Sequence, residues 1–251
     1  MTDKINDVHL HLGYSDDIMR GLSFNDVQKF KEENNIENML LFPFYNERQD
    51  VIDNTHTMIA QLHDSDKKIR GLYWLNDNTK FITLEGVFAG GFVGFKYHGA
   101  YTGLPISDVK WEQTLTNLNT KNGILLVHCG MFDEGRITSN TSFYHTLLVA
   151  NRYRDIKVIL GHAGGSMLPI IKRCCQFVKD IPNIWLETSG ISTPVAVDYI
   201  ANTVGVQKIL FGSDAPWCSF KSALYNVLDC NLPESKKKLI LHENYLNMLK
   251  S

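Results

Sequence analysis

Short apolar runs alternate along the chain with longer stretches in which apolar residues recur every three or four positions. The short runs are rich in branched and aromatic side chains, as buried strands are. They predict eight strands, at Asp7–Leu12, Asn38–Phe42, Ile69–Trp74, Phe92–Tyr97, Ile124–Val127, Val158–Leu160, Ile184–Leu186 and Ile209–Phe211. The longer stretches predict helices between the strands, and a closing C-terminal helix is indicated by Leu239, Leu241, Tyr245 and Leu249.

Eight strand-then-helix units predict a fold of the α/β class. Over 251 residues they match a single (β/α)8 TIM barrel spanning positions 1–251, with room for slight distortion. An open doubly wound sheet has the same alternation. Two features favour the barrel: the first strand is not followed by a G-x-G-x-x-G turn, and polar residues follow nearly every strand, where barrel active sites lie.

The composition of the chain argues against nucleic acid and membranes as binding partners. The chain has 25 Lys+Arg against 27 Asp+Glu, and a formal net charge of −2 gives no broad attraction to nucleic acid or anionic membrane. No apolar run approaches the roughly 20 residues that span a bilayer. The first residues lack a secretion pattern, and the 5 cysteines show no C-x-x-C spacing. We therefore expect a cytoplasmic protein that binds neither nucleic acid nor membrane.

The first candidate chemistry lies in the first predicted strand, Asp7-Val8-His9-Leu10-His11. Side chains alternate faces in a strand, so His9 and His11 point the same way, which is inward in a barrel. Two neutral imidazoles on one face can bind one metal ion. A surface pair or a hydrogen-bonded core pair explains the motif equally well when it is considered alone.

Three further motifs follow later strands. His128 comes at the end of the fifth strand, His162 lies in Gly-His-Ala-Gly-Gly after the sixth, and Asp214 lies in Gly-Ser-Asp-Ala-Pro-Trp after the eighth. Singly, these are typical of core histidines and a turn aspartate. Together with His9 and His11 they place five ligand-type side chains at one rim, which suits Zn²⁺ or a similar divalent ion.

This combination resembles the amidohydrolase superfamily, and most closely its amidohydrolase-2 branch of metal-dependent hydrolases and nonoxidative decarboxylases. The resemblance runs from Asp7 to Trp217. It implies that a divalent metal is bound by His9, His11, His128 and Asp214. It also implies that His162 lies beside the bound water or substrate, or completes a second metal site.

A neighbouring barrel family, the TatD-like nucleases, shares the opening His-x-His. There we would expect Glu at the fourth strand and Glu-Thr-Asp at the eighth. This chain has Lys96 and Gly212-Ser213-Asp214 at those places. Lys96 itself has three interpretations: a carboxylated bridge between two metals, an ammonium that holds an anionic substrate, or a packing residue.

We expect Zn²⁺, with Mn²⁺ and Fe²⁺ as alternatives, and one ion rather than two. Arginine suits carboxylate recognition, so Arg48 and Arg136 are candidate substrate contacts, as are His98 and Trp217; ordinary surface or packing roles are the alternatives. The ligand would be a small molecule, with a carboxylate as an option. Homodimerisation is a further option that no sequence feature tests.

The expected reaction is hydrolysis of a small amide, lactone or related carbonyl compound. A divalent ion lowers the pKa of water from 15.7 to about 7, Asp214 would act as general base, and His162 would polarise the carbonyl. The alternative is nonoxidative decarboxylation of a small aromatic or unsaturated acid at the same site. A barrel that binds a ligand without turnover is disfavoured, because all five positions are filled.

Overall fold

The computed structural model describes residues 4–79, 84–130 and 138–251. Among them the strands run in chain order as β1 Ile5–Ser15, β2 Arg20–Leu22, β3 Ile36–Pro43, β4 Ile69–Trp74, β5 Phe92–Tyr97, β6 Ile124–Val127, β7 Lys157–Leu160, β8 Ile184–Glu187 and β9 Ile209–Leu210. The α-helices of the same residues are α1 Val27–Glu33, α2 Gln49–Ser65, α3 Leu84–Ala89, α4 Gly99–Thr102, α5 Glu112–Thr120, α6 Phe143–Arg152, α7 Leu168–Val178, α8 Pro194–Thr203, α9 Phe220–Leu228, α10 Glu234–Lys238 and α11 Asn244–Lys250.

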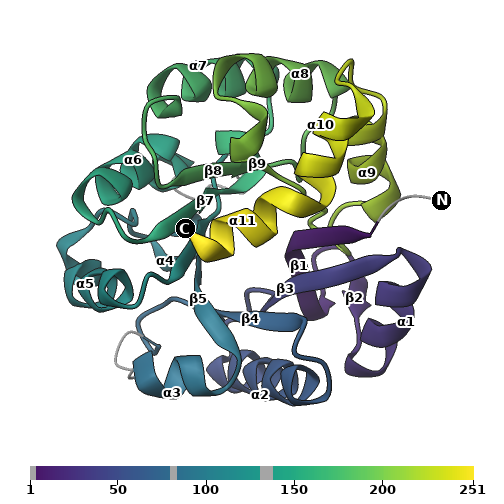
Figure 1. Cartoon of the computed structure of the whole chain (residues 1–251). Coiled ribbons are helices and arrows are strands. Elements are labelled where there is room, and N and C mark those ends of the chain that lie inside the picture. The colour runs from purple at the N-terminus through teal and green to yellow at the C-terminus, as the bar shows by residue number, and fades with distance from the viewer. Residues whose placement is uncertain (1–3, 80–83, 131–137) are drawn as a thin grey trace.

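The sheet has the order β2-β1-β3-β4-β5-β6-β7-β8-β9, and every neighbouring pair except β1 and β2 is parallel. The ring closes between β1 and the segment after β9. Val8 N donates to Phe211 O at 3.0 Å, Asp214 N to His9 O at 2.8 Å, and His11 N to Ala215 O at 2.9 Å. Helices surround the strands in Figure 1. The (β/α)8 barrel predicted from the alternation is therefore confirmed.

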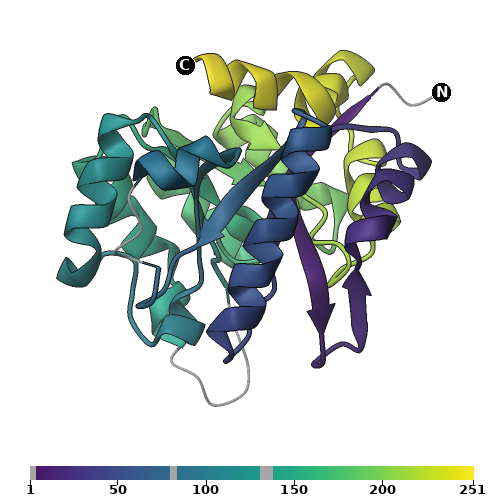
Figure 2. The ribbon, with the colours of Figure 1, turned by 90° about the horizontal axis from the view of Figure 1, so that it is seen from below.

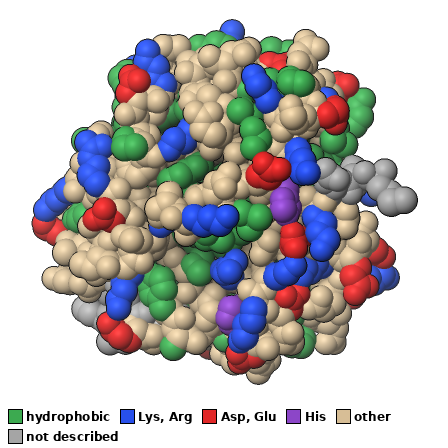
Figure 3. Space-filling model, in the orientation of Figure 1, with side chains coloured by type: hydrophobic (Ala, Val, Ile, Leu, Met, Phe, Trp, Pro, Cys, Tyr) green, Lys and Arg blue, Asp and Glu red, His purple; other side chains and the backbone are tan. Residues whose placement is uncertain are grey.

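Two apolar layers hold the barrel together. One lies between the strands and the surrounding helices. The other fills the interior, where Leu40, Leu72 and Leu126 pack with Tyr245 and Met248 of α11. The predicted closing helix thus seals the N-terminal end of the barrel, and Figure 2 shows it opposite the β1–β2 hairpin. Basic and acidic side chains are interspersed over this closed end in Figure 3.

The β1–β2 hairpin is an addition that the sequence pattern did not predict. β1 continues past the expected Leu12 to Ser15 and pairs antiparallel with β2, with Gly13 opposite Leu22. Gly13 has a φ of 100°, a conformation that a glycine adopts without strain. The hairpin carries Ser15 and Asp17 to the C-terminal mouth of the barrel, where both line a cavity. No helix in the described parts of the chain combines the length and apolar character needed to cross a membrane.

Candidate metal centre

A cavity of about 430 Å³ opens at the C-terminal ends of the barrel strands. The predicted site residues that line it are His9, His11, Lys96, His98, His128, His162, Asp214 and Trp217. Arg48 is not among the lining residues, because its exposed guanidinium pairs with Asp50 at 2.6 Å. Arg136 lies outside the described residues. The expectation that polar residues after the strands meet at one rim therefore brought eight of the candidates together, whereas Arg48 lies away from them.

The side chains of His9 and His11 project from the same face of β1, as their spacing predicts. His11 Nδ1 lies 3.2 Å from Pro43 O of β3, and its ring stacks on Phe44 with centroids 4.4 Å apart. The Nε2 atoms of His9 and His11 lie 3.2 and 3.1 Å from Asp214 Oδ1. Both imidazoles thus converge on one carboxylate oxygen from the far end of the sequence.

Asp214 is held by the turn that closes the ring. Its φ is 58°, and its backbone N–H donates to His9 O. The carboxylate of Asp7, buried within β1, accepts from the N–H groups of His9 at 3.0 Å and Ser213 at 3.1 Å. Burial raises the pKa of Asp7 to about 7. Asp7 belongs to the first motif of the sequence analysis. Its contact with the backbone of Ser213, which joins β1 to the segment after β9, could not be inferred from the sequence.

The contacts among these three side chains require a positive charge. Pro43 O accepts only, so His11 Nδ1 carries the proton and its Nε2 is a lone pair when the ring is neutral. That lone pair faces an acceptor-only carboxylate oxygen at 3.1 Å. Burial lowers the pKa of His11 to about 4, so the neutral ring prevails. A cation between the facing acceptors resolves the conflict, and the donor set of imidazole nitrogen and carboxylate oxygen suits a divalent metal.

The pKa shifts of Asp214 and His9 also indicate that this part of the cavity favours a bound positive charge. Burial favours the neutral acid, but the charge of nearby His9 holds the pKa of Asp214 well below its usual range. Burial and Lys96 disfavour the charged form of His9, yet Asp214 and Glu187 outweigh them and raise its pKa. The floor of the cavity therefore holds a permanent anion that recruits positive charge.

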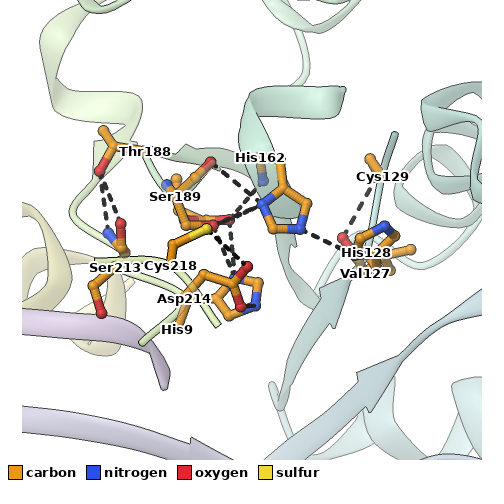
Figure 4. A network of polar contacts seen from close by, with 12 residues as sticks. His9, Val127, His128, Cys129, His162, Thr188, Ser189, Ser213, Asp214 and Cys218 are labelled. Atoms are coloured by element: carbon orange, nitrogen blue, oxygen red, sulfur yellow. Dashed lines mark hydrogen bonds and ion pairs between the residues drawn. The ribbon is translucent and has the colours of Figure 1, made fainter. Parts of the chain in front are cut away.

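His162 completes the closest group of ligand atoms. In the described parts of the chain, His9, His162 and Asp214 each offer a ligand atom within 4.8 Å of the others. Burial lowers the pKa of His162, which keeps it available as a neutral donor of a lone pair. His162 Nε2 lies 3.0 Å from His128 Nδ1, so His128 joins the group through His162 (Figure 4). Cys129, next to His128, is buried and lines the cavity.

Behind these rings lies a polar segment that follows β8. Glu187 Oε1 lies 3.0 Å from His9 Nδ1, a contact that orients the imidazole ring. Ser189 Oγ lies 2.8 Å from His162 Nδ1 and donates to Glu187 Oε1 at 2.7 Å. Sequence reasoning missed Ser189. The only signal was the polar run Glu187-Thr188-Ser189 directly after a buried strand.

Lys96, the penultimate residue of β5, lies at the floor of the cavity. Its Nζ lies 3.3 Å from His9 Nε2 and 4.8 Å from the centre of the Phe42 ring. The side chain is buried, and burial lowers the pKa of Lys96 to about 8 against the pull of Asp214 and Glu187. An ammonium this close to the facing acceptors offers one source of the positive charge that they require.

Aromatic rings form the wall of the cavity. Tyr45 and Tyr101 stack with centroids 3.9 Å apart, and Tyr101 lies 4.4 Å from the ring of His98. His98 in turn stacks on His128 at 3.8 Å. Trp217 stands at the rim with 37% of its surface exposed. Tyr101 was not a sequence candidate because it lies on α4, beyond the strand end where polar and aromatic residues were sought.

Known proteins share this fold. No curated protein sequence gives a significant match. Among solved structures, 2,6-dihydroxybenzoate decarboxylase from Rhizobium has a TM-score of 0.78 at 14% identity, and covers 99% of each chain. Dihydroxybenzoic acid decarboxylase from Polaromonas sp. JS666, with bound manganese and the inhibitor 2-nitroresorcinol, has a TM-score of 0.74 at 14% identity, over 98% of this chain and 97% of that one.

A third similar structure is the probable 2-pyrone-4,6-dicarboxylic acid hydrolase from Acinetobacter baumannii with citric acid bound. Its TM-score is 0.70 at 15% identity, over 98% of this chain and 99% of that one. At such identities these likenesses establish the fold. The family model Amidohydro_2, described as Amidohydrolase, matches residues 53–248. Since this match spans most of the barrel and agrees with the resemblance of the sequence motifs, the chain belongs to the amidohydrolase-2 family.

Proposed function

We propose that the chain is a metal-dependent hydrolase of a small amide, lactone or related carbonyl compound. The observation that carries the proposal is the convergence of His9 Nε2 and His11 Nε2 on Asp214 Oδ1 at the floor of a cavity with aromatic walls. Members of the family are metal-dependent enzymes. When bound, a divalent ion polarises a carbonyl and lowers the pKa of water to about 7.

The ion would be held by His9, His11 and Asp214. An imidazole from the His128–His162 pair completes the set, and His162 is the one that lies within 4.8 Å of the His9 and Asp214 ligand atoms. Zn²⁺ is the first candidate and Mn²⁺ or Fe²⁺ are alternatives, since imidazole and carboxylate accept all three. One ion rather than two is proposed, with Lys96 as an uncarboxylated ammonium.

Asp214 is the proposed general base. It stays ionised, and its second oxygen is in contact with Cys218 Sγ at 3.7 Å on the cavity side. A carboxylate in this place accepts the proton of the attacking water and delivers it to the leaving group. Lys96 supplies charge for a carboxylate or a developing oxyanion on the substrate. The rings of Tyr45 and Tyr101 cover the substrate and exclude bulk water.

Decarboxylation is the second candidate, and the aromatic wall is the observation that favours it. A planar aromatic acid stacked on Tyr101 would direct its carboxylate toward Lys96. Asp214, if protonated in that cycle, would deliver its proton to the ring carbon as carbon dioxide leaves. The wall and the floor therefore fit both reactions, which differ in the bond that breaks.

The test is to load the purified protein with Zn²⁺ or Mn²⁺ and offer two panels in H₂¹⁸O. One panel contains small lactones and amides, and the other contains hydroxylated aromatic acids. Incorporation of ¹⁸O into a product carboxylate, lost in Asp214→Asn, is the expected result. Release of carbon dioxide without ¹⁸O incorporation would replace hydrolysis by decarboxylation. Full activity in Asp214→Asn would overturn both candidates.

A further inference from the structure

A buried polar segment after β8 determines which nitrogen of His162 carries the proton. Glu187 and Ser189 are both fully buried. Oε1 of Glu187 accepts from the backbone N–H of His162 at 2.6 Å, and Oε2 accepts from the backbone N–H of Ser189 at 2.7 Å, so both carboxylate oxygens act as acceptors. Glu187 is therefore ionised, and an ionised carboxylate only accepts hydrogen bonds.

The proton positions follow from this acceptor. Ser189 Oγ lies 2.7 Å from Glu187 Oε1, so the hydroxyl proton must point to Glu187. The serine oxygen then has only lone pairs for His162 Nδ1, which lies 2.8 Å away. His162 Nδ1 must therefore carry a proton and donate it. The reverse arrangement would place a serine lone pair against a carboxylate oxygen at hydrogen-bond distance.

Two further contacts of His162 are consistent with a proton on Nδ1. Ser189 O, a carbonyl that only accepts, lies 3.3 Å from His162 Nδ1. On the other side of the ring, His162 Nε2 lies 3.0 Å from His128 Nδ1 and can accept from it. Figure 4 shows the imidazole of His162 between Ser189 and His128.

The backbone holds this ring in place at a strained turn. His162 has φ 54° and ψ 37°, a left-handed conformation that costs about 1–3 kcal/mol outside glycine. Its N–H donates to Glu187 Oε1 at 2.6 Å, so the same carboxylate supports the turn and the side chain. The following Gly190 leaves room for the ring, because a Cβ there would lie 3.0 Å from His162 Nδ1.

We infer that Ser189, itself held by Glu187, fixes His162 as the Nδ1–H tautomer and leaves the lone pair on Nε2, where His128 Nδ1 can donate to it. In its neutral form His162 thus accepts at Nε2, either from His128 or from an ion or proton that replaces this contact, and it does not donate a hydrogen bond to a substrate carbonyl. This differs from the polarising role expected from the sequence. The role of the lone pair in turnover rests on the proposed function, whereas the tautomer is a property of the metal-free protein.

The experiment is ¹⁵N NMR of the histidine side chains in metal-free protein at about pH 8, above the ordinary histidine pKa. Protonated and lone-pair nitrogens give separate ¹⁵N resonances, and His162→Gln identifies the signals of His162. A protonated Nδ1 and a lone-pair Nε2 are expected. A protonated Nε2 with a bare Nδ1 would overturn the inference, whatever the activity of the metal-loaded enzyme.

Ser189→Ala tests the role of the serine, and Thr188→Val is the matched control. Thr188 is the preceding buried hydroxyl, and it bonds the backbone of Gly212 rather than a histidine. In Ser189→Ala the Nδ1 proton of His162 should shift upfield, with some Nε2–H form appearing, while Thr188→Val leaves both unchanged. A His162 spectrum in Ser189→Ala that superimposes on wild type would show that Ser189 does not set the tautomer. If Ser189→Ala fails to fold, the wild-type spectrum still decides the tautomer.

Discussion

The two mouths of the barrel both bury polar side chains, but the partners of these side chains differ. At the N-terminal mouth, the two N–H groups of Asn183 Nδ2 are shared among three backbone carbonyls at 3.0–3.2 Å, and Asn244 Nδ2 donates to two carbonyls at 2.7 Å. Lys157 Nζ likewise donates to Asn122 O at 3.2 Å. At the C-terminal mouth, His9, His11 and Asp214 face one another instead.

The difference separates stability from chemistry. A side chain that satisfies backbone carbonyls stabilises the fold, because those carbonyls would otherwise be buried without a donor. Side chains that present acceptors to one another are in conflict until a cation or a substrate arrives. In barrels of this class, the C-terminal face carries the active site and the N-terminal face carries stability. The predictions below test this division.

The largest effect is expected from Asp214→Asn. The amide cannot accept a proton from water, and general-base catalysis contributes about 10²–10⁴-fold, so kcat/KM should fall by at least that factor. Stability of the metal-free protein should be kept or raised, because an amide N–H can donate to the facing lone pair of His11. Thermal melting and steady-state kinetics check the two halves. A variant that melted far below wild type would place Asp214 with the stabilising residues.

Asn183→Ala is the opposite case at the closed mouth. Three buried carbonyls lose their donor, and the free energy of unfolding should fall by about 2–4 kcal/mol. The kcat/KM of the folded fraction should stay within about twofold of wild type. Urea denaturation and kinetics below the transition provide the measurement. A selective loss of activity at unchanged stability would contradict the division between the mouths.

His56 on α2 should behave as a stabilising residue because its partner is backbone. His56 Nε2 accepts from Trp74 N at 3.0 Å, and burial lowers the pKa of His56 from 6.5 to about 3. Since the folded pKa lies below the unfolded one, the unfolded state binds the proton first. Stability is therefore lost as the pH falls from 6.5 toward 3, by up to about 1.4 kcal/mol per pH unit.

The matching variant is His56→Gln, which keeps an acceptor for Trp74 N–H but does not titrate. The difference in unfolding free energy between pH 7 and pH 4.5, from urea titrations, should be smaller in the variant than in wild type. Equal differences in the two proteins would show that His56 does not contribute to acid sensitivity.

Metal removal should destabilise the fold moderately. An ion present at 100 times its Kd contributes about 2.7 kcal/mol, which corresponds to roughly 5–10 °C in Tm for a chain of this size. Dialysis against a chelator should lower Tm by this amount, and Zn²⁺ or Mn²⁺ should restore it. Asp214→Asn is the control, since its Tm should respond weakly to the ion. An identical response of the two proteins would place the ion elsewhere.

Arg48→Ala should have the smallest effect. The guanidinium is exposed, pairs with Asp50 and does not line the cavity. Stability should change by less than about 0.5 kcal/mol and kcat/KM by less than about twofold. A large rise in KM would restore Arg48 as a substrate contact and show that its loop closes over the cavity during turnover.

Much of the fold was accessible from sequence, because burial leaves a periodic trace. β4, β5 and β6 have the bounds that their apolar runs predicted, Ile69–Trp74, Phe92–Tyr97 and Ile124–Val127. β2 was missed, since a short exposed strand at an edge has no apolar run of its own. The barrel then placed His9, His128 and Asp214 at one rim without any knowledge of their contacts.

The orientation of the side chains was not accessible in the same way. Whether His128 Nδ1 faces His162 or the cavity floor depends on ring rotation. Whether Ser189 contacts His9 or His162 depends on the backbone of the segment after β8, which no local sequence pattern specifies. The stacking of Tyr101 on Tyr45 joins α4 to the segment after β3. Sequence periodicity predicts which face of a helix or strand is buried, but it does not predict the torsion angles of the side chains.

The hydrogen bonds that join the first strand to the turn after the last one have a consequence for biogenesis. His11 and Asp214 are 203 positions apart, so the proposed ion-binding pair comes together only when nearly the whole chain has left the ribosome and its two ends have met. A nascent or truncated polypeptide cannot capture the ion through this pair. Occupancy of the proposed centre would thus mark a completed ring, and ion binding would depend on contacts between residues far apart in the sequence, which form slowly.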